Sequence, residues 1–253
     1  VCTMSESWPE LVNQQETGDL SVKKSSTRPE LTDENSIYSF EDAEFGIYEK
    51  EEFSAEPKAV LKTGASGETN TVTLPAGIYY VKERKAPAGY RLSQEVKKVV
   101  LTKGEHQQVI FEDEPFFQPV ETAVQKKIKG GTDLSREGAE FTLCYYGGEK
   151  LLRTWVLRTD AEGYAKFEDS YKISGDPFYQ VNGKAVLPLG RLTIEETKAP
   201  AGLLKDPEIR TFVSDEEGKY QGEAGNSFTN EGIVVTDEPV YGNVRICKRS
   251  QDL

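Results

Sequence analysis

The residues of this sequence that could do chemistry fall into two matching sets, each with one lysine, one glutamate and one aspartate. The sets recur in the same order along the chain: Lys24, Glu83 and Asp113, then Lys126, Glu196 and Asp237. Each of these residues follows a short stretch in which apolar side chains alternate. Because a strand has a side-chain period of two, each shares a face with the apolar residues before it. The pattern predicts that all six ionisable side chains point into hydrophobic cores.

Burial of a lysine beside two carboxyl groups favours one particular reaction between them. Desolvation lowers the pKa of an amine and raises that of an acid, which favours the neutral, reactive form of each. The lysine amine could then attack the aspartate carbonyl carbon while the glutamate carries protons, and water would leave. Folding would supply the proximity, with an effective molarity on the order of 10⁵ to 10⁸ M. The alternative is a buried, hydrogen-bonded ionic triad without a covalent bond.

Two further lysines compete for the role of nucleophile. Lys23 and Lys127 are adjacent to Lys24 and Lys126, and strand parity places them on the opposite face. A β-bulge would reverse that assignment. Glutamates also flank both aspartates and would add like charge near the reaction: Glu112, Glu114 and Glu238.

The elements that must position these residues form an internal repeat of three landmarks. The paired landmarks are DAEFGIY (42–48) with GAEFTLC (138–144), YYVKERKAPAGY (79–90) with LTIEETKAPAGL (192–203), and VIFEDEP (109–115) with VVTDEP (234–239). Alternating apolar residues predict strands, and Pro-Ala-Gly predicts a turn. A lysine-bearing strand precedes each copy, from residues 18 and 122. The sequence therefore predicts two tandem all-β domains, 17–117 and 118–241, with QPVE (118–121) as the linker between them.

The remaining segments fall at the two ends and in the longer second copy. Residues 1–16 are expected to be a linker or the remnant of a preceding repeat. Residues 242–253 resemble the lysine-bearing opening strands, so Lys248 would be the crosslinking lysine of a further repeat, unless this tail packs on the second domain. The second copy adds a hairpin-like segment at 159–169 and an insertion at 174–190. We expect the sequence to be a segment of a longer repetitive protein.

Composition excludes several classes of partner and cofactor. The 43 acidic residues outnumber the 31 basic ones, and a net charge of -12 argues against nucleic acid or an anionic membrane as a partner. No apolar stretch has the length of a membrane span. The cysteines Cys2, Cys144 and Cys247 are widely spaced and odd in number, so they are expected to be free thiols. With the single His106, expected in a loop, they predict neither a metal site nor a cofactor.

Around the two glutamates the sequence resembles the collagen-adhesin B-type (CnaB-type) family, which has a SpaA-like prealbumin fold and occurs in Gram-positive pilins and surface adhesins. The family motif Tyr-x-Leu-x-Glu-x-x-Ala-Pro-x-Gly-Tyr is matched twice, with Val81, Leu192 and Leu203 as departures. The resemblance covers nearly all of the chain and implies prealbumin-like, inverse immunoglobulin-type β-sandwiches. It also implies one lysine isopeptide bond per domain. The family usually uses an Asn acceptor, whereas Asp113 and Asp237 match its Lys-Asp subclass, which releases water.

The resemblance implies a structural stalk or pilin-like segment in the cell wall or at the surface of a Gram-positive bacterium. Its partners would be neighbouring repeats of the same chain, and its only catalysis would be single-turnover bond formation. The alternative is an adhesin whose second domain contacts host extracellular protein or glycan through Tyr164, Phe178 and Tyr179. A glycosidase with paired carboxylates is disfavoured, because these carboxylates are expected inside a sandwich rather than in a cleft.

Overall fold

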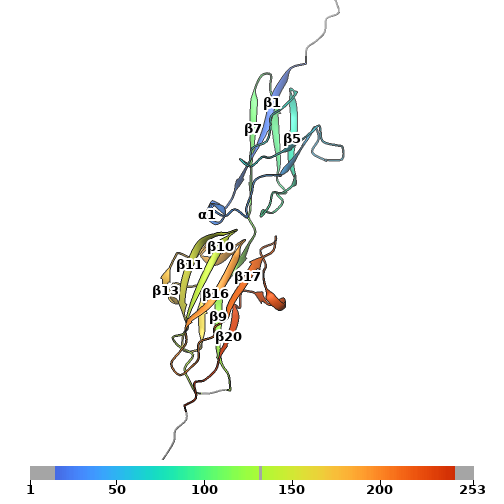
Figure 1. Cartoon of the computed structure of the whole chain (residues 1–253). Coiled ribbons are helices and arrows are strands. Elements are labelled where there is room, and N and C mark those ends of the chain that lie inside the picture. The colour runs from blue at the N-terminus through green and yellow to red at the C-terminus, as the bar shows by residue number, and fades with distance from the viewer. Residues whose placement is uncertain (1–14, 131–132, 243–253) are drawn as a thin grey trace, which may run out of the picture. The chain divides into compact units, whose positions relative to one another are not determined.

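The computed structural model describes residues 15–130 and 133–242. Contacts divide the described residues into two compact units: unit 1 contains 15–27 and 39–114, and unit 2 contains 28–38, 115–130 and 133–242. In each unit two β-sheets enclose a hydrophobic core (Figure 1). The fold class is therefore all-β, with two tandem sandwiches, as the sequence predicts.

The two sheets of unit 1 have three and four strands. The first has the order β4 (Val72–Pro75), β1 (Thr17–Ser26) and β7 (His106–Asp113). The second has the order β3 (Ala59–Lys62), β2 (Glu44–Tyr48), β5 (Gly77–Lys85) and β6 (Val96–Leu101). The first and last strands, β1 and β7, lie side by side and are parallel (Figure 1).

Unit 2 has the same arrangement with additional strands. One sheet has the order β12 (Tyr164–Lys166), β9 (Thr122–Ile128) and β20 (Ile233–Asp237), with β9 and β20 parallel. The other has seven strands: β13 (Lys172–Gly175), β11 (Lys150–Arg158), β10 (Glu140–Gly147), β16 (Arg191–Lys198), β17 (Ile209–Ser214), β18 (Tyr220–Gly222) and β19 (Ser227–Phe228). The helical elements are α1 (Pro29–Thr32) and the 3-10 helix η1 (Glu223–Gly225).

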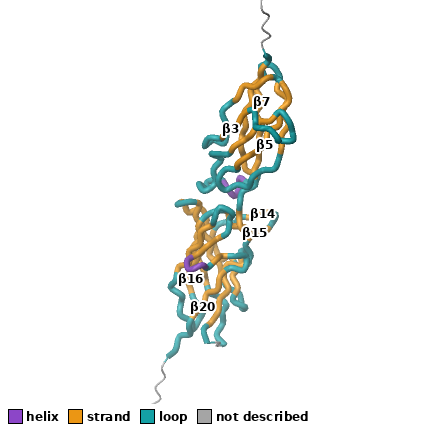
Figure 2. The backbone as a smooth tube through the Cα atoms, turned by 90° about the vertical axis from the view of Figure 1, so that its right-hand side faces the viewer, coloured by secondary structure: helices purple, strands orange, loops and turns teal. Residues whose placement is uncertain are grey.

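A third small sheet belongs to unit 2 alone. It consists of β14 (Gln180–Val181), β15 (Lys184–Pro188) and β8 (Phe117–Pro119), and the hairpin that β14 and β15 form is labelled in Figure 2. The hairpin falls in the insertion at 174–190. Residues 118–121, expected to be a linker, lie within unit 2, where β8 pairs with β15 and Val120 is buried in the core.

The segment before β2 also belongs to unit 2, although the sequence division had placed it in domain 17–117. Leu31 is fully buried in the unit 2 core. Asn35 is 3% exposed and donates hydrogen bonds to the Tyr145 hydroxyl at 2.9 Å and to the Leu189 carbonyl at 2.8 Å. A buried amide requires such partners. Unit 2 therefore includes residues 28–38 as part of its core.

The repeated Pro-Ala-Gly turn has the same geometry in both units. Gly89 and Gly202 have φ of 87° and 83°, a left-handed conformation that glycine adopts without strain. The next residue in each turn, Tyr90 or Leu203, donates a backbone hydrogen bond to the turn's proline carbonyl. The turn reverses the chain directly after the strand that carries the glutamate.

Some expectations fall on residues that the structure does not describe, including Cys2, Cys247 and Lys248. Cys144 is described and is a free, half-buried thiol on β10. His106, expected in a loop, instead begins β7 and lies within 3.2 Å of the Ser21 hydroxyl. Neither of the helices in the described part of the chain is long and apolar enough to span a membrane.

Candidate functional site

Parallel pairing of the first and last strands sets the position of the lysine and the aspartate. In unit 1, Lys24 on β1 lies opposite Phe111 of β7, two residues before Asp113. In unit 2, Lys126 on β9 lies opposite Val235 of β20, again two residues before the aspartate. A two-residue step returns to the same face of a strand, so both side chains point into the core.

The glutamate comes from the opposite sheet. Glu83 on β5 lies opposite Phe45 of β2, and Glu196 on β16 lies opposite Phe141 of β10. A register shift precedes the phenylalanine in both units. Lysine and aspartate on one sheet therefore face a glutamate on the other across the interior of each sandwich.

The three side chains are in direct contact in both units, and each is fully buried. Lys24 Nζ lies 2.6 Å from Glu83 Oε1 and contacts Asp113 Oδ1. Lys126 Nζ lies 2.5 Å from Glu196 Oε1 and contacts Asp237 Oδ1. We call these two sets the unit 1 triad and the unit 2 triad.

One oxygen of each glutamate is fixed by the backbone. The Ser93 amide donates to Glu83 Oε2 at 2.7 Å, and the Asp206 amide donates to Glu196 Oε2 at 2.8 Å. The donor lies ten residues after the glutamate in both units. The other oxygen, Oε1, is thereby directed at the lysine.

The aspartates are less well satisfied. Within the described residues, Oδ2 of Asp113 and Oδ2 of Asp237 are buried and have no hydrogen-bond partner. Lys126 Nζ donates hydrogen bonds to both of its carboxyl partners, whereas Lys24 Nζ is close to its partners without hydrogen-bond geometry. Buried polar atoms without partners are rare in folded proteins and need an explanation.

Aromatic rings make the surroundings of the lysines apolar. Lys24 Nζ lies 5.3 Å from the centre of the Phe45 ring and 5.8 Å from that of Phe111. In unit 2, Lys126 Nζ lies 5.4 Å from the centre of the Phe141 ring. The rings exclude water, and their faces carry partial negative charge toward the nitrogen.

Burial shifts the acid groups toward their protonated forms. Desolvation raises the pKa of Glu83 to about 7, although Lys24 opposes the shift. Desolvation likewise raises the pKa of Asp113 and of Glu196, again against the attraction of the lysine. A triad with both carboxyls ionised would also leave a net negative charge in a dry interior, which is strongly unfavourable. Burial therefore favours the protonated forms of these carboxyls, and in unit 1 the pKa of Glu83 lies near neutral pH.

A glycine fixes the backbone of each lysine. Lys24 N donates to the carbonyl of Gly67 at 2.8 Å, and Lys126 N donates to that of Gly163 at 2.7 Å. Both glycines have positive φ, 77° and 88°. A Cβ on Gly67 would lie 3.1 Å from the Lys24 carbonyl oxygen, and one on Gly163 would lie 2.7 Å from that of Lys126. No larger residue fits these positions without moving the lysine.

The competing residues lie outside the cores. Lys23 is partly exposed and pairs with Glu68 at 3.1 Å, and Lys127 is exposed. The flanking glutamates are exposed as well, so their charges are screened by water: Glu112, Glu114 and Glu238. Strand parity thus separates the inward lysine from its neighbour in both units.

The groups that hold the triad side chains in position were not predicted from the sequence. These are the glycines, the phenylalanine rings, and the backbone amides of Ser93 and Asp206. A signal existed for the amides, because the interval from glutamate to donor spans the Pro-Ala-Gly turn and is equal in both repeats. No such constant spacing marks the glycines, which lie in loops of different length.

Other candidate residues are spread over unit 2. Tyr164 accepts a hydrogen bond from Gln125 at 2.7 Å, Tyr179 is buried in the core, and Phe178 is half-buried beside a pocket. Tyr179 is thus unavailable for contact with a ligand. Among the described residues no group of three or more His, Cys, Asp or Glu side chains has an arrangement that could hold a metal ion.

Fold and site together define a class of tandem β-sandwich in which the first and last strands meet at a buried Lys-Asp-Glu triad. A family model described as "SpaA: Prealbumin-like fold domain" matches residues 28–115 and 122–227. The two matches cover most of the sequence, and the chain belongs to this family.

Solved structures give the same fold. The Bacillus anthracis TIE protein is 27% identical over 89% of this chain, with a TM-score of 0.58. The C-terminal fragment of the pilus adhesin SpaC from Lactobacillus rhamnosus GG is 18% identical over 92% of this chain and 100% of its own length, with a TM-score of 0.53. This chain spans 34% of the TIE chain. A search of curated proteins returned no match.

Proposed function

We propose that this chain is a stalk segment of a Gram-positive surface protein, in which an isopeptide bond between lysine and aspartate locks each sandwich. The observation that carries the proposal is the pair of equivalent, fully buried triads, each joining the first strand to the last. Membership of the SpaA prealbumin-like family and the fold shared with a pilus adhesin support the cell-surface role.

The reaction is a condensation of two neutral groups. The lysine nitrogen attacks the aspartate carboxyl carbon, a C–N bond forms, and one C–O bond of the carboxyl breaks. The glutamate carboxyl donates a proton to the departing oxygen and accepts one from the nitrogen, so it ends in its original state. Water leaves with one aspartate oxygen and two hydrogens. The bond removes two groups that are costly as buried charges and one unpaired oxygen.

Intact mass of the purified chain tests the proposal. Two bonds reduce the mass by two water molecules relative to the sequence. Glu83→Gln and Glu196→Gln should each restore one water, because the amide cannot shuttle protons in the same way. The matched controls are Lys23→Ala and Lys127→Ala, which change the neighbouring exposed lysine and should leave the deficit unchanged.

Peptide mapping then locates each bond. Digestion should give one crosslinked peptide pair that joins β1 to β7 and another that joins β9 to β20. A wild-type chain with the full sequence mass would refute bond formation and leave the triads as buried ion pairs.

A further inference from the structure

Unit 2 contains a pocket that the triads do not use. The pocket has a volume of about 520 Å³ and lies between the β14–β15 hairpin, the segment 119–121 that leads from β8 into β9, and the turn after β12. This volume is within the range of roughly 300 to 1,000 Å³ that is usual for small-ligand sites. One wall comes from the insertion that unit 2 carries and unit 1 lacks. Loops added to a conserved scaffold are a common location of binding sites.

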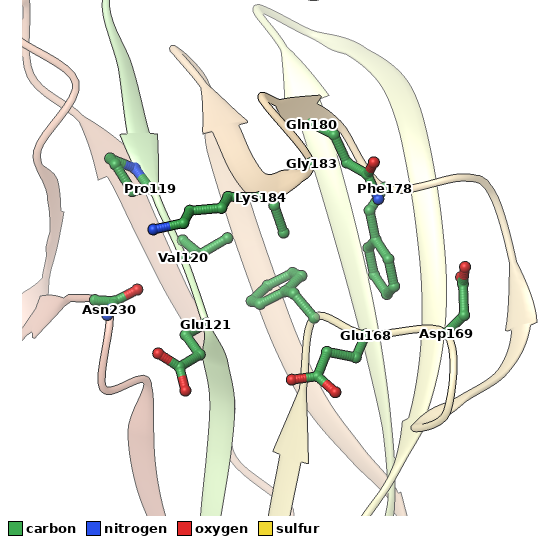
Figure 3. Close-up of a pocket in the computed structure, with 12 residues that line it drawn as sticks. Pro119, Val120, Glu121, Glu168, Asp169, Phe178, Gln180, Gly183, Lys184 and Asn230 are labelled. Atoms are coloured by element: carbon green, nitrogen blue, oxygen red, sulfur yellow. The ribbon is translucent and has the colours of Figure 1, made fainter.

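The pocket combines an apolar wall with polar groups on its rim. Phe178 is half-buried at the edge of the pocket, and Lys172 Nζ lies 4.6 Å from the centre of its ring. The deeper lining of the pocket includes the buried residues Phe167, Val120 and Ala185. Figure 3 shows Lys184, Glu121 and Asn230 on one side, and Phe178 and Asp169 on the other. A ligand with one apolar face and a polar edge would fit this arrangement.

Charges in the pocket are nearly balanced. Glu121 faces Lys166 at 3.9 Å, and Asp169 pairs with Lys172 at 2.7 Å. Glu168 and Lys184 remain, one of each sign, and no hydrogen bond or ion pair in the described structure occupies either side chain. A strongly charged ligand would therefore leave one of them opposed by like charge.

The unused polar groups require a ligand that both donates and accepts hydrogen bonds. The Glu168 carboxylate only accepts, and the Lys184 ammonium only donates. The side-chain amides of Gln180 and Asn230, which make no hydrogen bond within the described part of the chain, can do both. A sugar ring has hydroxyl groups on its edge that donate and accept, and C–H groups on its face that can pack on an aromatic ring.

We propose that this pocket binds a neutral saccharide, with the C–H groups of the sugar against the apolar wall that includes Phe178 and its hydroxyl groups between Glu168 and Lys184. The site would add adhesion to the stalk role, and it does not depend on the isopeptide bonds.

Saturation-transfer NMR on the whole chain tests this proposal. The probes are the methyl glycosides of glucose, galactose, mannose and N-acetylglucosamine. At least one should receive saturation from the protein. Lys184→Ala and Glu168→Gln should each weaken its binding by about tenfold, since each removes a hydrogen bond to a charged group. Both residues are exposed, so these variants should fold.

Phe178→Ala should abolish the signal, and Phe53→Ala is its matched control. Phe53 is also a half-buried ring beside a lysine, with Lys82 Nζ at 5.2 Å, and it lies in unit 1. Intact mass of the same samples reports the crosslinks separately, so failure of this proposal is distinguishable from failure of the other. The proposal would be overturned if none of the glycosides received saturation. It would also be overturned if a tetra-arginine peptide bound and no glycoside did, because the pocket would then select a strongly charged ligand.

Discussion

At the scale of single residues, burial is energetically costly for the ionisable groups of the two triads. In each triad, folding removes a lysine and two carboxyl groups from water, and the attraction between them must offset the lost hydration free energy. Desolvation raises the acid pKa values, most clearly that of Glu83, and this favours the protonated acid that condensation needs. The same burial that is costly for charges prepares the groups to react.

The raised pKa of Glu83 predicts a pH dependence for the unit 1 bond. Its ordinary pKa of 4.5 rises to about 7 in the folded chain, so the glutamate is protonated below neutral pH, ionises around it and is mostly ionised above it. The rate of bond formation should therefore fall by up to about tenfold for each pH unit above 7. To measure the rate, the chain would be solubilised from inclusion bodies in guanidinium and refolded at several pH values. Samples taken over time would be digested, and the amount of the crosslinked peptide that joins β1 to β7 would be measured.

The Glu83→Gln variant serves as the control in this series. It should form little of the unit 1 bond at any pH while unit 2 continues to react. A wild-type rate that rises steadily through pH 9 would contradict the role given to protonated Glu83.

At the scale of elements, parallel pairing of the terminal strands makes the chemistry possible. Antiparallel neighbours are joined by short turns, whereas parallel strands need a long connection. Here the connection is nearly the whole domain, so a bond between β1 and β7, or between β9 and β20, closes almost the complete fold. The equal two-residue offset between lysine and aspartate in both units fixes the reacting groups at the same depth.

The loop glycines beside each lysine predict a second effect at this scale. Gly163→Ala would place a methyl group 2.7 Å from the Lys126 carbonyl oxygen at a φ of 88°. It should lower the free energy of unfolding of unit 2 by about 1 to 3 kcal/mol and slow formation of the unit 2 bond. Denaturant titration and the intact-mass time course would measure the two effects.

Gly183→Ala is the matched control for this substitution. Its φ is also positive, at 75°, but no atom lies within 4 Å of the added Cβ. It should cost stability through strain alone and leave the rate of bond formation unchanged. Equal slowing by both variants would refute a positioning role for Gly163.

At the scale of the whole molecule, the proposed bonds would determine how the chain responds to force. A covalent link between the first and last strands would bear the pulling force, so the strands between them would not be loaded. Each link would also close a loop, of about 90 residues in unit 1 and about 110 in unit 2, and would thereby restrict the unfolded chain. By the same entropy as a disulfide of that span, each bond would stabilise its unit by about 4 to 5 kcal/mol. Unlike a disulfide, an amide is not reduced.

Single-molecule extension from the two ends gives a prediction at this scale. The wild-type chain should show no unfolding step from either unit, because residues between the crosslinked positions cannot extend. Lys24→Ala should release about 300 Å when unit 1 unfolds, the extended length of about 90 residues. The Lys23→Ala chain should behave like wild type, and a wild-type step of about 300 Å would contradict a covalent lock.

The sequence by itself determined the fold class, the repeat and the inward direction of the six ionisable residues. These follow from local rules, because strand alternation fixes which side of a strand Lys24 or Asp113 occupies. Family resemblance around Glu83 and Glu196 added the architecture.

Tertiary structure alone decided the rest. Only the pairing of distant strands brings lysine, aspartate and glutamate into contact, and only the folded loops place the Ser93 amide on Glu83 or Gly163 against Lys126. The same holds for residues 28–38, whose buried Leu31 and Asn35 join the unit 2 core although they precede β2. Such contacts depend on residues far apart in the chain, and local periodicity carries no information about them.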